Sequence, residues 1–204
     1  MSDESDKYQF IADSLAESGW VVVPNFLSDE LSRALQAEAR QLCSAAEFRP
    51  AGVGKGESWK LVPEIRDDKV HWLNEPFSAT QAAYLAELEQ LRQAINQTLF
   101  LGLWDYEGHY ALYGPGSHYS RHVDQFANTS QRTVTAIVYL NDDWQLEDGG
   151  QLRIYLNGEE AEPFEDVLPE RGTLACFLSA GFYHEVLPAG RERLSVTGWF
   201  RTRE

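Results

Sequence analysis

A histidine and an aspartate, His122 and Asp124, are separated by one residue in a β-rich stretch of the sequence. Side chains two positions apart in a strand point to the same face, so the imidazole and the carboxylate should project together while Val123 points away. The pair could supply two ligands to a metal ion. On its own the pattern is weak, because a hydrogen-bonded surface pair is the more frequent origin of this spacing.

A second histidine, His184, lies far downstream in another short β-rich run. Two imidazoles and one carboxylate, drawn from two separated strands, form the facial triad of non-haem Fe(II) oxygenases, which leaves half of the octahedron open for a co-substrate and O2. A lone histidine in such a run is otherwise more often a hydrogen-bonded core or edge residue. The iron site is therefore a hypothesis that needs support from further residues.

Arg193 follows His184 across a Pro-Ala-Gly turn and should lie on the facing strand of a hairpin. A guanidinium there could reach the same cavity and bind a carboxylate through two parallel hydrogen bonds. A surface arginine is the alternative, because Arg191 lies close by. The order His-x-Asp, a long gap, His, a turn and Arg favours the functional interpretation.

The first half of the chain must position these residues through helices. Apolar residues recur at helical spacing over 8–18, and Ser28 is placed to cap a second helix. A third helix, over 78–101, has the clearest apolar stripe, which comprises Tyr84, Leu88, Leu91, Ile95 and Leu99. A short strand is predicted at 20–23, and the stretch 52–72, which begins with several glycines, is a candidate lid.

After Gly102 the pattern changes to short alternating runs separated by turn residues. These runs are HYALY, SHYSRHVD, RTVTAIVYL, QLRIYL, TLACFL, YHEVL and RLSVTGWF. Many strands at regular spacing after a helical half predict a β-sandwich or barrel. The predicted fold is mainly β with supporting helices, in a single domain over 1–204, with helical support and a lid segment in 1–101 and the β core in 102–204.

Composition narrows the class of protein. The 204 residues are 43% hydrophobic and 24% charged, which is typical of a globular protein. The acidic start lacks the layout of a signal peptide, no apolar run is long enough to span a membrane, and Cys43 and Cys176 suggest reduced thiols, so we expect a cytoplasmic location. The net charge of −15 disfavours nucleic acid as a partner. A chain of this length can bury its own core, which favours a monomer.

Several blocks of the sequence, taken together, resemble one enzyme family. They are YSRHVD (119–124), TAIVYLN (135–141), HEV (184–186) and the segment from Arg193 to Trp199. Upstream, IRDDKVHW (65–72) matches the pattern I-R-x-D-K-x-x-W, which is not part of the metal site and argues against accidental convergence. Over about 60–203 the chain resembles the Fe(II)- and 2-oxoglutarate-dependent prolyl hydroxylases, in the branch of the hypoxia-inducible-factor prolyl hydroxylases and their bacterial relatives.

The resemblance implies a double-stranded β-helix, or jelly-roll, with Fe(II) held by His122, Asp124 and His184. The co-substrate 2-oxoglutarate would chelate the iron, and Arg193 and the Tyr139 hydroxyl would bind its far carboxylate. O2 is the second co-substrate, and ascorbate is a candidate reductant.

Further contacts follow from the same resemblance. Tyr113 and Thr197 would contact 2-oxoglutarate, although the segment after Tyr113 is one residue shorter than in the animal pattern. The residues carried over to the substrate side are Tyr119, Trp199, Arg132, Asp68, Arg66 and Trp72. Within this set, Arg132 and Asp68 correspond to a pair that ties the upstream loop to the barrel. The other tryptophans, Trp59 among them, are interpreted as packing residues, and His109 is not expected to be a ligand.

The implied reaction couples decarboxylation of 2-oxoglutarate to succinate and CO2 with C4 hydroxylation of a prolyl residue in a protein. The branch has a role in oxygen sensing, and a bacterial member would suggest elongation factor Tu as the target, through a proline in a flexible loop. Two alternatives stay open. The chain could be an oxygenase that acts on another peptide residue or a free amino acid, or a catalytically silent metal-binding sensor.

Overall fold

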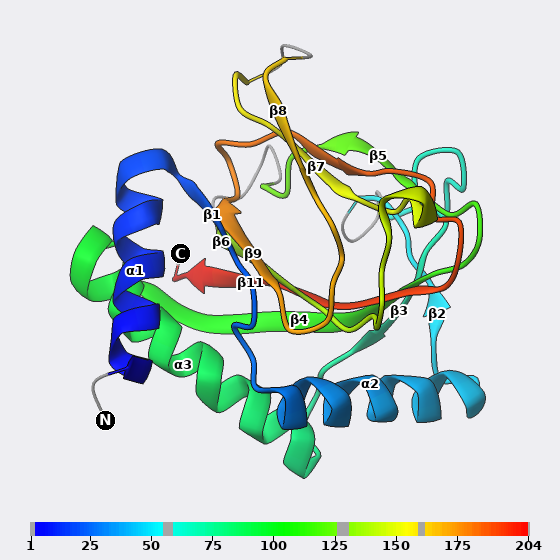
Figure 1. Cartoon of the computed structure of the whole chain (residues 1–204), viewed down its shortest axis with the longest axis horizontal. Coiled ribbons are helices and arrows are strands. Elements are labelled where there is room, and N and C mark those ends of the chain that lie inside the picture. Colours follow the sequence, from blue (N-terminus) through cyan, green and yellow to red (C-terminus); the bar gives the residue numbers. More distant parts are fainter. Residues whose placement is uncertain (1–2, 55–58, 126–130, 159–161, 204) are drawn as a thin grey trace.

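A computed structural model describes residues 3–54, 59–125, 131–158 and 162–203 (Figure 1). Its helices are α1 (Asp3–Ser18), α2 (Asp29–Ser44) and α3 (Ala79–Leu99). The hydroxyls of Ser28 and Ser78 accept hydrogen bonds from the backbone N–H groups of Leu31 and Gln81, and so cap α2 and α3. The first helix, which the sequence predicts over 8–18, begins earlier in the structure, at Asp3.

Two antiparallel sheets form the β core. The larger sheet has the order β1-β9-β6-β11-β4-β3-β2, and the smaller has the order β5-β10-β7-β8. The strands of the larger sheet are β1 (Trp20–Val23), β2 (Arg49–Pro50), β3 (Lys69–Trp72), β4 (Leu103–Tyr113), β6 (Arg132–Tyr139), β9 (Leu174–Leu178) and β11 (Arg193–Thr202). Those of the smaller sheet are β5 (Tyr119–His122), β7 (Leu152–Tyr155), β8 (Phe164–Val167) and β10 (His184–Val186), and a short 3-10 helix, η2 (Leu146–Asp148), precedes β7.

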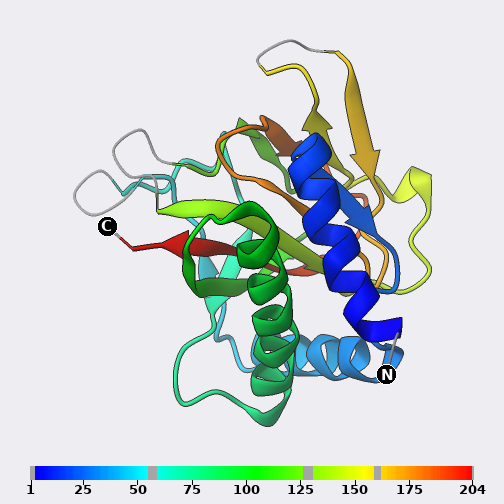
Figure 2. The ribbon, with the colours of Figure 1, turned by 90° about the vertical axis from the view of Figure 1, so that its left-hand side faces the viewer.

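The larger sheet is covered on both faces, which explains why its central strands are apolar on both faces. One face packs against the helices through a cluster that includes Leu35, Tyr84 and Val196. Figure 2 shows α1 and α3 side by side on this face. The other face packs against the smaller sheet through a second cluster, which includes Tyr139 and Phe177. This arrangement of facing sheets with a helical layer is the predicted jelly-roll with its helical support.

The candidate lid, 52–72, is not one continuous loop in this fold. Residues 69–72 form β3, which pairs with β4 in the larger sheet, so this end of the segment is sheet and the prediction of a lid is wrong there. Residues 55–58 lie outside the described residues. The part that leads into β3 is fastened to β5, because Ser120 donates a backbone hydrogen bond of 2.7 Å to the carbonyl of Ile65.

None of the described helices combines the length and the apolar character that crossing a bilayer requires. Cys43 is half-buried and Cys176 is buried, and both are free thiols.

Candidate metal centre and its cavity

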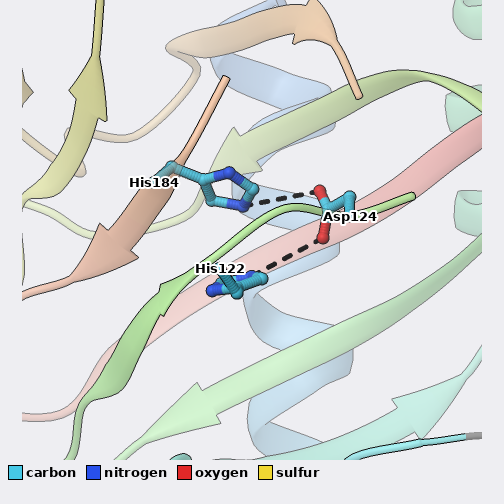
Figure 3. Close-up of side chains that lie close together, drawn as sticks. All are labelled: His122, Asp124 and His184. Carbon is cyan, nitrogen blue, oxygen red and sulfur yellow. Dashed lines mark ion pairs between the residues drawn. The ribbon is translucent and has the colours of Figure 1, made fainter. Parts of the chain in front are cut away.

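His122, Asp124 and His184 converge at one point between the two sheets. His122 ends β5 and His184 begins β10, and the antiparallel pairing of these strands places the two histidines opposite each other. Asp124 follows β5 directly and turns back toward them, as Figure 3 shows. Potential ligand atoms of the three side chains lie within 4.8 Å of one another. The group could therefore hold one metal ion.

Both imidazoles are oriented by the backbone. Nδ1 of His122 lies 2.8 Å from the carbonyl oxygen of Ser120, and Nδ1 of His184 lies 3.1 Å from that of Phe182. A proton on each Nδ1 would donate to these carbonyls and leave Nε2 as a free lone pair, as is usual for histidines that bind metals. The Nε2 atoms lie 3.6 Å and 3.5 Å from the two carboxylate oxygens of Asp124, a spacing that suits donors sharing an ion better than a direct hydrogen bond.

The protonation states of the donors also suit a cation. Burial and the neighbouring His122 lower the pKa of His184 to about 4, so its imidazole is neutral at pH 7. Burial alone would raise the pKa of Asp124, but the interactions of its carboxylate with the His184 and His122 imidazoles outweigh burial and hold that pKa well below its usual range. A neutral imidazole and an ionised carboxylate are the forms that bind a metal.

A threonine and a serine that sequence reasoning missed fix the carboxylate of Asp124. Thr135 donates a hydrogen bond of 2.8 Å to Asp124 Oδ2, and its hydroxyl lies 2.9 Å from that of Ser179. Thr135 and Ser179 are fully buried. A hydroxyl residue in the middle of the apolar run of β6 was the signal that could have indicated this support.

Arg193 begins β11 of the larger sheet and His184 begins β10 of the smaller sheet, so the expected hairpin pairing of their strands is wrong and the two residues lie on facing sheets. The Arg193 side chain is 1% exposed, and among the described residues no carboxylate pairs with it. Nε donates a hydrogen bond of 2.8 Å to the Gly150 carbonyl, and the guanidinium carbon lies 5.0 Å and 5.1 Å from the ring centroids of Tyr113 and Tyr139. A buried cation of this kind requires an anionic partner.

The Tyr139 hydroxyl supplies a second unused donor beside Arg193. It is buried and makes no hydrogen bond within the described part of the chain. Burial raises the pKa of Tyr139 to about 12 against the opposing charge of Arg193, so the phenol keeps its proton at pH 7. A cation and a neutral O–H donor side by side suit a carboxylate that enters from outside the chain.

Close backbone packing of Gly150 makes room for the Arg193 side chain. Gly150 has φ of +65°, and a Cβ placed on it would lie 3.1 Å from Arg193 Cδ and 3.2 Å from Ala189 Cβ. A side chain at this position would therefore be strained by both conformation and contact.

A cavity of about 1200 Å³ connects the metal cluster, Arg193 and the outer surface. Most of the candidate site residues line it, and these are Arg66, Trp72, Tyr113, Tyr119, His122, Asp124, Arg132, His184, Arg193, Thr197 and Trp199. Tyr139 and Asp68 do not line it, but they contact Arg193 and Arg66, which do. The cavity exceeds the usual size of a small-molecule site, about 300–1,000 Å³.

Tyr119 connects the segment upstream of β3 to His122, a candidate metal ligand. Its ring stacks on the His122 imidazole, with centroids 3.6 Å apart and an angle of 15° between the planes. The Arg66 guanidinium lies 4.3 Å from the Tyr119 ring centroid. Arg66 in turn donates two hydrogen bonds, of 2.7 Å and 2.6 Å, to the buried carboxylate of Asp68.

The expected pair of Arg132 with Asp68 is wrong in this structure. Asp68 is bound by Arg66, two residues before it, while Arg132 donates a hydrogen bond of 2.9 Å to Glu107 on β4. The Arg132 guanidinium carbon lies 3.4 Å from the ring centroid of Trp199. The connection of the upstream segment to the barrel therefore passes through Arg66, which binds Asp68 and lies over the ring of Tyr119.

Sequence reasoning also missed two aromatic side chains of the cavity wall. Trp59, which we interpreted as packing, is 51% exposed and lines the cavity. His109 is buried between the rings of Trp72 and Trp199, with centroid distances of 4.7 Å and 5.6 Å. Burial and the charges of Arg66 and Arg132 lower the pKa of His109 to about 3. No sequence motif indicates these positions.

We expect the metal-free protein to lose stability as the pH falls from 7 to 5. His184 and His109 have pKa values of about 4 and about 3 in the folded state, below the 6.5 of a free histidine. The unfolded chain therefore takes up protons first, and the free energy of unfolding should fall by roughly 2–4 kcal/mol over this interval. Urea unfolding at several pH values measures it. His109→Phe should make the free energy of unfolding depend less on pH. A free energy of unfolding that stays constant from pH 7 to pH 5 in the unaltered protein would contradict the buried neutral state of both imidazoles.

Comparison with known proteins identifies the class to which this fold and site belong. The family model described as 2OG-Fe(II) oxygenase superfamily matches residues 108–201. The crystal structure of a Pseudomonas putida prolyl-4-hydroxylase is 46% identical, covers 97% of this chain and 100% of its own, and superposes with a TM-score of 0.86. A prolyl hydroxylase from Trichoplax adhaerens, in complex with a peptide fragment of the hypoxia inducible factor oxygen degradation domain, is 25% identical with the same TM-score over 97% of this chain and 90% of its own.

Among curated proteins, Egl nine homolog 1 of Homo sapiens is 32% identical over 94% of this chain and 46% of its own length. The chain thus spans about half the length of the curated relatives of this name, with shares of 46%, 58% and 49%. The chain belongs to the Fe(II)- and 2-oxoglutarate-dependent oxygenases, in the prolyl hydroxylase family. Members of this superfamily use Fe(II), 2-oxoglutarate and O2, as the resemblance implied.

Proposed function

We propose that the chain is a single catalytic domain that hydroxylates a prolyl residue of a protein at C4, with decarboxylation of 2-oxoglutarate to succinate and CO2. The observation that carries the proposal is that one cavity holds both a His-Asp-His cluster and a buried arginine, Arg193, which pairs with no carboxylate among the described residues. A metal cluster alone would also suit a silent sensor. The anion site beside it is what a co-substrate with a free carboxylate requires.

We assign the iron to His122, Asp124 and His184. Two imidazoles and one carboxylate match the donor set of Fe(II) oxygenases with open coordination positions. The carbonyls of Ser120 and Phe182 hold the imidazoles in their orientation. When bound, iron with 2-oxoglutarate and O2 supplies the oxidation, in which one oxygen atom enters succinate and the other enters a C–H bond of the substrate.

We assign the far carboxylate of 2-oxoglutarate to Arg193 and Tyr139. The guanidinium offers charged N–H donors that the described residues leave without a carboxylate, and the phenol offers an O–H donor. Tyr113 lies against the same guanidinium, and Thr197 lines the cavity on the Arg193 strand. These two residues would orient the rest of the co-substrate.

The substrate side is assigned to the outer part of the cavity. Tyr119 stacks on His122 of the metal cluster, and Arg132 stacks on Trp199. Trp72 is 41% exposed and forms the rim. Arg66 and Asp68 support this side indirectly, by holding Tyr119 in place. A cavity larger than a small-molecule site and an aromatic wall suit a prolyl ring on an extended peptide better than a free amino acid.

For the target protein we propose elongation factor Tu, with the proline in a flexible loop. The similarity to the Pseudomonas putida enzyme supports a target of the bacterial branch, and that to the Trichoplax adhaerens enzyme, which is in complex with a peptide fragment, supports a peptide substrate. A role in oxygen sensing follows if O2 limits this reaction in the cell.

Incubation with Fe(II), 2-oxoglutarate, O2 and elongation factor Tu tests the proposal. We expect a peptide of the factor to gain the mass of one oxygen atom on a proline, with formation of one succinate per hydroxylation. A factor whose target proline is replaced by alanine is the matched control, and its peptide should not gain the mass of an oxygen atom. Succinate formed without any modified proline, in this factor or in the hypoxia-inducible-factor peptide, would contradict prolyl hydroxylation and favour another substrate.

A further inference from the structure

His109 carries a polar atom that nothing in the fold uses. The residue is 3% exposed, and its Nδ1 is buried without a hydrogen-bond partner among the described residues. Buried side-chain nitrogens normally have a partner, because an unpaired one costs free energy. The side chain lines the cavity, so a partner can reach it from there.

The register of the larger sheet places His109 between the co-substrate and the rim. Trp72 on β3 pairs with His109 on β4, and His109 pairs with Thr197 on β11. These side chains therefore follow one another across the sheet, from the position assigned to 2-oxoglutarate out to the exposed Trp72. A group that enters over Trp72 toward the metal cluster passes His109 on the way.

The surroundings fix the ring and select its charge state. The indoles of Trp72 and Trp199 hold the imidazole at 4.7 Å and 5.6 Å. With a pKa of about 3 the imidazole is neutral at physiological pH, and a neutral imidazole offers one N–H donor and one acceptor. A proline has no backbone N–H, so the backbone group that the target proline itself offers for a hydrogen bond is its carbonyl oxygen.

We infer that His109 is a positioning residue for the peptide substrate, whose Nδ1–H donates a hydrogen bond to a backbone carbonyl beside the target proline. This assignment rests on the proposed prolyl hydroxylation. It adds a contact with the peptide backbone to the contacts that recognise the ring of the proline. The bond fixes the depth at which the proline enters the cavity, while the two indoles fix the plane of the donor. Side chains further along the peptide have no part in it.

Kinetic constants of two variants test the inference, with elongation factor Tu and the hypoxia-inducible-factor peptide as probes. His109→Phe keeps a ring between the indoles but removes the nitrogen, and should raise the KM for the hydroxylated probe about 10-fold. The KM for 2-oxoglutarate should change less than twofold. His109→Asn places an amide near the position of Nδ1 and should restore most of the affinity. His118→Phe, which replaces a histidine outside the cavity lining, should change neither constant.

A spectroscopic measurement separates positioning from a structural role. In the zinc-loaded protein, the nitrogen-15 signal of His109 Nδ1, assigned by its loss in His109→Phe, should shift when the probe is added. An unchanged signal, or a KM for the probe that stays the same in His109→Phe, would overturn the inference while prolyl hydroxylation stands. An increased KM for 2-oxoglutarate instead would assign the nitrogen to the co-substrate. If the unaltered enzyme hydroxylates neither probe, the proposed function fails and this assignment with it.

Discussion

Asp124→Asn should remove iron binding and, with it, the turnover of 2-oxoglutarate. The substitution keeps the shape of the side chain but removes the charge that faces His122 and His184. Substitutions of residues behind metal ligands already cost about 10- to 100-fold in affinity or activity, so loss of a ligand charge should cost at least about 100-fold. Anaerobic equilibrium dialysis with Fe(II) measures the affinity, and succinate formation measures the turnover.

The matched control is Asp166→Asn. Asp166 lies on β8 and pairs with Arg153 at 2.8 Å, so the change also breaks an ion pair of an aspartate, but outside the cavity lining. It should leave iron affinity and turnover close to their original values. Unchanged succinate formation by Asp124→Asn, in a protein that is still folded, would show that this carboxylate does not hold the metal.

Arg193→Ala should raise the KM for 2-oxoglutarate far more than it weakens iron binding. Charged hydrogen bonds of this kind contribute about 1.5–3 kcal/mol, so an increase of up to about 100-fold is expected. Arg193→Lys keeps a positive charge but loses the planar donor pair. Its KM for 2-oxoglutarate should lie between that of the unaltered enzyme and that of Arg193→Ala. Succinate formation at increasing 2-oxoglutarate gives the KM, and dialysis gives the iron affinity.

Arg201→Ala is the control on the same strand. Arg201 donates to Asp105 and Glu107, so its ion pairs are complete within the chain and need no ligand. It should leave the KM for 2-oxoglutarate unchanged. The KM for 2-oxoglutarate could also stay unchanged in Arg193→Ala while only the unfolding temperature falls. That result would mean that Arg193 stabilises the fold and that the co-substrate carboxylate binds elsewhere.

The parts of the site that could be predicted from the sequence are those that depend on short-range geometry. The short spacing of His122 and Asp124 brings both to the metal cluster, although Asp124 lies beyond the end of β5. The hairpin expected between His184 and Arg193 is wrong, because β10 belongs to the smaller sheet and β11 to the larger one, and the turn between them carries Arg193 to the facing sheet. The fold class follows from the change of helical to alternating patterns at Gly102. The two correct predictions need only residues that are near one another in the sequence.

The parts that could not be predicted depend on the register between strands that are distant in the sequence. The register of β3, β4 and β11 places His109 between Trp72 and Thr197, and that of β6 and β9 brings Thr135 to the metal cluster. The ion pair of Asp68 could not be predicted for a related reason. The resemblance implied Arg132 as the partner of Asp68, whereas the structure pairs Asp68 with Arg66. This pairing depends on the path of the chain before β3, which no motif specifies.

The most direct test of the account is a crystal structure of the protein grown without oxygen in the presence of Fe(II) and 2-oxoglutarate. The account predicts one iron ion bound by Nε2 of His122, Nε2 of His184 and a carboxylate oxygen of Asp124, with 2-oxoglutarate on the open side and its far carboxylate on Arg193 and Tyr139. An ion with a fourth ligand from the protein, or a co-substrate whose far carboxylate lies away from Arg193, would contradict it.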